Sequence, residues 1–298
     1  MNPEATIILI GILVSWTCGL LGVFLVVRRM SMLGDAISHA VLPGIVLSYL
    51  FMGERNSILL MAGAALSGVL VTVLIETLTR KARMQEQASV GISFTLFFAI
   101  GIILVSLYSG NVDIDADCVL YGEIAMTPFD KWSWMQRDMG SRHLAVLTGV
   151  LMVLGAAIFM GYKGLMVTSF NAEFALASGV AAAAWHYVLM SGVALVTVVS
   201  FEAVGAILVV GFLAIPPATA WIWTKRLPNM ILLTLLFGAL SAVSGFYVAR
   251  LLDSSISASM TVVALLIFLF SLLLQKVKQK RVLDPGRQRS PHQVFYKR

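Results

Sequence analysis

Residues 5–27 read ATIILIGILVSWTCGLLGVFLVV and contain no charged side chain. An apolar run of about 20 residues spans the roughly 30 Å hydrocarbon core of a bilayer as a helix. The run follows Glu4 rather than a basic segment, is too long for a signal-peptide core and lacks a small-x-small exit. We therefore expect it to remain in the mature chain as a first transmembrane helix.

The rest of the chain repeats this pattern. Hydrophobic residues make up 59% of the 298 residues and charged residues only 12%, against about 25% in soluble domains, which excludes a soluble enzyme. The sequence predicts an all-α polytopic membrane protein. Nine apolar runs are expected to span the membrane: 5–27, 32–52, 57–78, 90–109, 143–161, 181–201, 203–223, 229–250 and 256–275. The separation at 201–203 is weak, so the count is eight or nine.

The charges predict the orientation. Sixteen of the 21 basic residues fall on one side if the N-terminus is outside, and basic residues favour the cytoplasmic side. We therefore expect an external N-terminus, a cytoplasmic C-terminus, a transmembrane domain over 1–275 and a basic cytoplasmic tail over 276–298. The net charge of +6 then reflects this rule and a tail attracted to anionic membrane lipid, with no role for nucleic acid.

Asp35 and His39 stand out in the second run because ionisable groups within a span are costly and usually functional. Their i,i+4 spacing places both side chains on one helical face. A carboxylate and an imidazole can hold a divalent cation, with further ligands from water or a second subunit. The alternative is structural: Asp35 caps the helix near Arg28 and Arg29, and His39 hydrogen-bonds across a helix interface.

Prolines and glycines predict helix breaks along a transport pathway. Pro43 and Gly44 directly follow the Asp35/His39 pair, and such breaks at membrane depth usually line a cavity. Pro216 and Pro217 are expected to kink or interrupt the seventh run. His186, between two aromatic residues, fits a packing or interfacial histidine, and the acidic stretch 113–117 fits a solvated loop rather than a calcium site.

The loop at 169–180 predicts a short helix on the cytoplasmic side. Ser169 or Asn171 can cap it, Glu173 lies in its first turn and Gly179 can end it. Such an element suits docking better than catalysis. The sequence has no phosphate-binding Gly-x-x-x-x-Gly-Lys-Ser/Thr loop and no metalloprotease or serine-hydrolase motif. The chain is therefore expected to be no enzyme, and any ATP hydrolysis must occur on another polypeptide.

Three segments together resemble the permease subunits of metal-type ABC importers, the uptake systems for manganese, zinc and iron. They are MSMLGDAISHAVLPG (30–44), FNAEFALASG (170–179) and FEAVGAILVVGFLAIPPATA (201–220). The similarity runs colinearly over about residues 7–275. It implies a type II ABC importer permease fold in a multi-pass protein of the bacterial plasma membrane.

The resemblance also implies partners and site residues. It implies two permease chains, two cytoplasmic ATPase subunits, an external metal-binding protein, and transported Mn²⁺, Zn²⁺ or Fe²⁺ without a permanently bound cofactor. The family's pathway metal site is similar to Asp35 and His39. Its coupling helix is similar to the segment with Asn171, Glu173, Ala175 and Gly179, although many relatives have Asp-Pro where this chain has Asn171-Ala172. A secondary metal transporter working alone is the alternative.

Overall fold

The computed structural model describes residues 3–30, 33–52, 57–108, 124–127, 131–134 and 137–283. Within these ranges nine helices are long and apolar enough to cross a membrane, which confirms the larger of the two expected counts. The elements are α1 (Pro3–Val27), α2 (Leu33–Ala40), α3 (Leu42–Met52), α4 (Ser57–Arg80), α5 (Glu86–Tyr108), η2 (Ile124–Met126), β1 (Lys131–Trp134), β2 (Arg137–Ser141), α7 (Arg142–Phe170), α8 (Ala172–Ala177), α9 (Ala182–Val204), α10 (Ala206–Trp223), α11 (Leu227–Leu252) and α12 (Ile256–Leu283).

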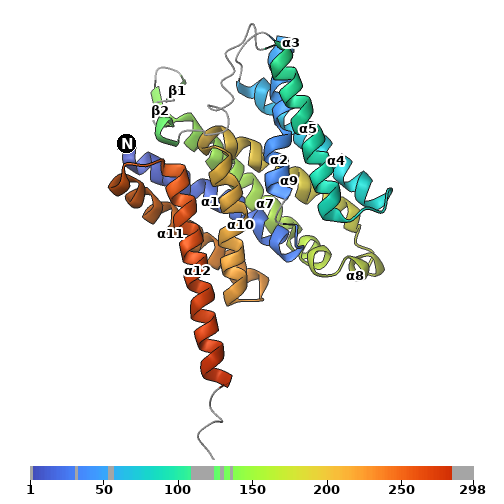
Figure 1. The fold of residues 1–298 in the computed structure, drawn as a ribbon, viewed down its shortest axis with the longest axis vertical. Helices are drawn as coiled ribbons and strands as arrows, with labels where there is room; N and C mark the ends of the chain where they lie inside the picture. Colours follow the sequence, from blue (N-terminus) through green and yellow to red (C-terminus); the bar gives the residue numbers. More distant parts are fainter. Residues whose placement is uncertain are drawn as a thin grey trace, which may run out of the picture.

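The helices form two groups joined by α7 and α9 (Figure 1). The helices α2 to α5 pack on one another, and α10, α11 and α12 pack around α1. In the apolar stretch of α1, 72% of the residues are buried, whereas in those of α5 and α7 only 17% are buried. A helix that is apolar on all sides and buried belongs in a core, while exposed apolar faces on membrane helices suit contact with lipid or another chain.

The second span is broken, as the sequence predicts. Helix α2 ends at Ala40 and α3 begins at Leu42, one residue before Pro43. The carbonyl of Ala40 accepts a hydrogen bond of 2.6 Å from Ser67 Oγ on α4, so this freed carbonyl is satisfied by protein. Gly44 lies directly against the backbone of Gly63. Small residues allow this close approach of α3 and α4 in a membrane.

Of the two effects expected of Pro216 and Pro217, a kink or an interruption, the structure contradicts the interruption; the kink stays a prediction. Helix α10 is continuous through both prolines. Proline lacks the N–H that would bond to the residue four positions earlier, so Pro217 leaves the Leu213 carbonyl without its helical partner. Gly22 of α1 packs against this carbonyl and the Pro217 ring. Close packing on α1 therefore accompanies the irregularity without a break in the helix.

The boundary between the sixth and seventh spans also differs from the expected position at 201–203. The chain reverses at Gly205, where φ is +80°, a value that favours glycine because other residues are strained there. Helix α9 therefore runs on to Val204 and includes Glu202 in its last turn. One residue suffices for the reversal, which is why the sequence shows almost no polar gap.

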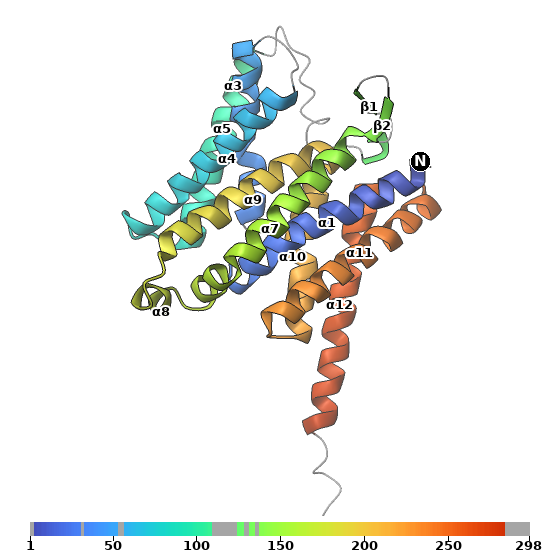
Figure 2. The same cartoon turned by 180° about the vertical axis from the view of Figure 1, so that it is seen from behind.

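Connections gather at two ends of the molecule (Figures 1 and 2). The N-terminus, the antiparallel pair β1 and β2, and the α11–α12 connection lie toward one end; α8 and the α10–α11 connection lie toward the other. The β1–β2 pair lies between the fourth and fifth expected spans, where the sequence analysis names no strand. Helix α12 continues to Leu283, into the expected tail. The acidic stretch 113–117 and the tail from 284 lie outside the described residues.

Candidate metal pathway and cytoplasmic end

Asp35 and His39 face each other on α2. His39 Nε2 lies 3.6 Å from Asp35 Oδ1, and their side chains are 28% and 52% exposed, respectively. Two ligands held about 2.0–2.2 Å from one ion in tetrahedral arrangement lie about 3.4 Å apart. The observed separation is thus close to that of two ligands sharing a cation. It is longer than an ordinary hydrogen bond.

Two aromatic rings of α5 fix the plane of His39. The ring centroids of Phe94 and Phe98 lie 5.5 and 5.7 Å from that of His39, in tilted and edge-on arrangements. These contacts cover the imidazole with apolar surface. They leave Nε2 directed toward Asp35, as the distance between the two groups requires.

The described part of one chain supplies too few ligands for a closed metal site. Among the described residues, no group of three or more His, Cys, Asp or Glu side chains could hold a metal ion. Asp35 lies in the first turn of α2, so its structural role at the helix start stays a prediction beside metal binding, while Arg28 contacts Thr168, Ser169 and His186. An incomplete site suits transport, since an ion in a pathway must leave as well as enter.

The short helix α8 forms as the sequence predicts. Asn171 Oδ1 accepts a hydrogen bond of 2.9 Å from the Phe174 N–H, which is an N-cap. Glu173 lies in the first turn, and the helix is followed by Gly179 at φ +77°. The expected contact surface needs one correction, because Ala175 is buried and anchors the helix to the protein. Its neighbours Phe174 and Leu176 are exposed instead.

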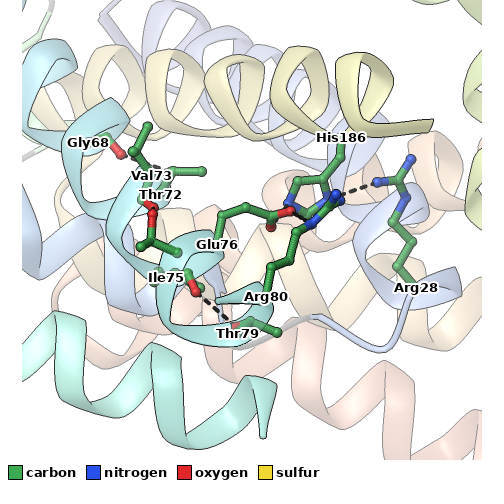
Figure 3. A network of polar contacts seen from close by, with 10 residues as sticks. Arg28, Gly68, Thr72, Val73, Ile75, Glu76, Thr79, Arg80 and His186 are labelled. Atoms are coloured by element: carbon green, nitrogen blue, oxygen red, sulfur yellow. Dashed lines mark hydrogen bonds and ion pairs between the residues drawn. The ribbon is translucent and has the colours of Figure 1, made fainter. Parts of the chain in front are cut away.

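A buried polar cluster at the same end was missed by the sequence analysis (Figure 3). Glu76 of α4 is 7% exposed; it pairs with Arg80, and its Oε2 lies 2.8 Å from His186 Nε2. His186 Nδ1 lies 3.3 Å from Arg28 Nη1. The signal was present, since Glu76 is a carboxylate inside the third apolar run. Its partner could not be read from the sequence.

The hydrogen-bond roles in this cluster follow from Arg28. Partial burial lowers the pKa of Arg28 from its ordinary value, but a guanidinium remains protonated and can only donate. His186 Nδ1 therefore accepts from Arg28, and we assign the imidazole proton to Nε2, which faces Glu76. His186 thus bridges Arg28 and Glu76 and is more than a packing histidine.

The fold and this site define a class: a multi-pass membrane permease with an aspartate–histidine pair inside one span and a short helix presented at one end. The model of the ABC 3 transport family matches residues 5–275, and the chain belongs to this family. It is therefore the membrane-spanning permease component of such a transport system, and a multi-pass bacterial membrane protein.

Relatives and a solved structure agree with this assignment. The chain is 44% identical over 260 residues to the manganese transport system membrane protein MntD of Bacillus subtilis (strain 168), covering 87% of this chain and 88% of MntD. It is 36% identical over 269 residues to the zinc transport system membrane protein TroD of Treponema pallidum (strain Nichols), covering 89% and 73%.

The solved structure of PsaBC from Streptococcus pneumoniae in complex with Fab is similar with a TM-score of 0.74 and 30% identity, covering 91% of each chain. The predicted family and the all-helical permease fold are confirmed. The roles of individual site residues stay predictions.

Proposed function

We propose that this chain carries a divalent transition metal ion, Mn²⁺, Zn²⁺ or Fe²⁺, into the cell, with Asp35 and His39 as transient ligands. The Asp35–His39 geometry carries the proposal: an oxygen and a nitrogen donor 3.6 Å apart, directly before the α2–α3 break. Relatives named for manganese and zinc transport support the substrate class. Such ligands accept all three ions, so the pair does not by itself select one.

The remaining ligands come from water or a second permease chain, and the energy source lies on another chain. The open site fits a pathway completed by water or by a second permease, identical or paralogous. The exposed Phe174 and Leu176 of α8 offer apolar surface to a cytoplasmic ATPase subunit, beside the acidic side chain of Glu173. An external metal-binding protein would deliver the ion at the opposite end. This arrangement places ATP hydrolysis on the partner and leaves the permease without catalytic residues.

The test replaces Asp35 and His39 by Ala, singly and together, in the complete transporter. We expect uptake of ⁵⁴Mn²⁺ or ⁶⁵Zn²⁺ to fall by at least about tenfold in the double variant, because a metal bound by fewer ligands loses affinity steeply. Gly149→Ala on α7 is the control, since a methyl group there meets nothing within 4 Å. Unchanged uptake by the double variant would remove the site assignment.

The rival function is a secondary transporter that works without an ATPase. A proton-coupled carrier generally needs a relay of intramembrane carboxylates or histidines, and it has no need of α8. Co-purification separates the two: the proposal expects an ATPase subunit to remain bound to the permease. Metal transport by this single chain in liposomes, without ATP, would favour the rival.

A further inference from the structure

Arg28 contacts the chain on both sides of α8. We call the end of α7 the upstream stem and the start of α9 the downstream stem. On the upstream stem, Arg28 donates to Ser169 Oγ and Thr168 Oγ1, each at 3.0 Å. On the downstream stem, it contacts His186 Nδ1 at 3.3 Å. Helix α8 lies between these anchoring points, so a displacement of α8 acts on both stems and on the end of α1.

The downstream stem is joined in turn to α4. His186 Nε2 lies 2.8 Å from Glu76 Oε2, and Arg80 pairs with Glu76 from the next turn of the same helix. Figure 3 shows Glu76, Arg80 and His186 converging, with Arg28 reaching the histidine from the far side. A buried carboxylate is costly to separate from its partners. Helices α1, α4 and α9 are therefore tied together at this point.

Helix α4 leads from this cluster to the candidate metal helix. It is one unbroken helix from Ser57 to Arg80. Further along it, Ser67 Oγ donates to the Ala40 carbonyl at 2.6 Å, and Ala40 directly follows His39. Gly63 on the same helix contacts Gly44 of α3. A shift of α4 must therefore act on the α2–α3 break.

The charges argue against a second metal site at this cluster. Glu76 and His186 are ligand types, but Arg28 and Arg80 contact them. With His186 neutral, the two guanidinium groups offset Glu76 and Glu86, whose carboxylates interact electrostatically, so no net negative charge is left to attract a divalent cation. The cluster is better suited to connecting the helices than to binding a metal ion.

We propose that the Glu76–His186 contact, held by Arg28, is the joint that couples movement of α8 to the α2–α3 break beside Asp35 and His39. The inference rests on the proposed function. Glu76 and His186 act through other groups and are positioning residues. The Glu76–His186 contact between α4 and α9 can be made or broken. A movement of α8 and a change at the α2–α3 break can each favour one of these two states, and this shared dependence couples them.

The test measures coupling directly. The full permease is reconstituted with its ATPase subunits and metal-binding protein in proteoliposomes, and Mn²⁺ uptake and ATP hydrolysis are recorded together. For Glu76→Gln, we expect Mn²⁺ imported per ATP hydrolysed to fall about tenfold, within the usual range of coupling factors, while the ATPase rate stays within about twofold. A purely structural role would lower both rates in proportion and leave their ratio unchanged, which would overturn the proposal.

A matched control is available at the other end of the molecule. Glu4 Oε1 lies 2.8 Å from Arg250 Nη1. Glu4 is in the first turn of α1 and Arg250 in the last turn of α11, and the N-terminal end of the chain lies away from α8 (Figure 2). Glu4→Gln should leave Mn²⁺ per ATP unchanged. An equal loss in Glu4→Gln would show that any lost ion pair uncouples transport, and it would contradict a specific joint.

Two further variants keep the test decisive. Glu76→Asp retains the charge but shortens the reach to His186, so it should also lower the ratio; an unchanged ratio would overturn the joint even if Glu76→Gln fails to fold. Combining Glu76→Gln with His186→Asn should cause no further loss, because residues of one contact are not additive. Additive losses would speak against the pair. If the unmodified complex imports none of Mn²⁺, Zn²⁺ and Fe²⁺, the proposed function itself fails, and the joint with it.

Discussion

Gly22 decides how closely α1 and α10 can pack. A methyl group at this position would overlap the Leu213 carbonyl and lie 2.8 Å from Pro217 Cγ. We predict that Gly22→Ala destabilises the protein by about 1–3 kcal/mol, the usual cost of overpacking. The measurement is the thermal unfolding midpoint in detergent.

Gly149 supplies the comparison for this prediction. It lies in helix α7 with nothing within 4 Å of an added methyl group, so Gly149→Ala should leave the midpoint unchanged or raise it, because alanine favours helix by about 1 kcal/mol. Equal midpoints for the two variants would show that α1 and α10 can separate without cost at Gly22.

At the residue scale, sequence spacing was informative only where both partners lie on one helix. Asp35 and His39 are four positions apart, so helix geometry alone predicts that their side chains meet. Glu76 and His186 come from different helices, α4 and α9, and Arg28 comes from the turn that directly follows α1. Tertiary packing brings them together, and no local pattern encodes that contact. Glu76 could have been noticed as a charge inside a span, but its partners could not.

Helix α8 depends on its N-cap because a six-residue helix has little stability of its own. We predict that Asn171→Ala, which removes the 2.9 Å bond to the Phe174 N–H, costs about 1 kcal/mol of helix stability. That loss should weaken binding of the ATPase subunit about fivefold, as 1.4 kcal/mol corresponds to tenfold. Binding is measured with purified permease in nanodiscs.

Asn171→Asp is the control for this prediction. It keeps the acceptor and adds a negative charge that the helix N-terminus favours, and it restores the aspartate that many related permeases are expected to have. ATPase binding should equal or exceed that of the unmodified chain. If Asn171→Ala bound as well as the unmodified chain, α8 would be held by its surroundings, chiefly through buried Ala175, and the cap would be dispensable.

At the element scale, apolar run length predicted every membrane helix, while backbone detail escaped it. The break after Ala40 was predicted by Pro43, whereas at Pro216 and Pro217 the sequence left a kink or an interruption open and α10 is continuous. The difference lies in neighbours: proline always removes a donor, and the packing around it decides whether the helix ends. The chain reverses at the single residue Gly205. A connection of one residue leaves no polar gap that a hydropathy pattern can show.

The whole molecule separates its connections into two ends, as the predicted orientation requires (Figure 2). Arg28, Arg80 and Lys225 belong to helix ends or connections at the α8 end, where basic residues were predicted to gather on the cytoplasmic side. The Asp35–His39 pair lies between the two ends on α2. The proposed metal route would therefore pass from one face to the other, with the proposed coupling at the α8 end.

The predicted orientation can be tested by cysteine labelling. Ser255, in the α11–α12 connection, and Ser178, directly after α8, are both exposed. In a chain carrying Cys118→Ser, with buried Cys18 retained, a membrane-impermeant maleimide should label Ser255→Cys in intact cells. Ser178→Cys should react only after the cells are permeabilised. The physical reason is the positive-inside rule, which favours the side with most basic residues as cytoplasmic. The reverse pattern would place α8 outside the cell, where no ATPase subunit could reach it, and would contradict both the orientation and the proposed coupling.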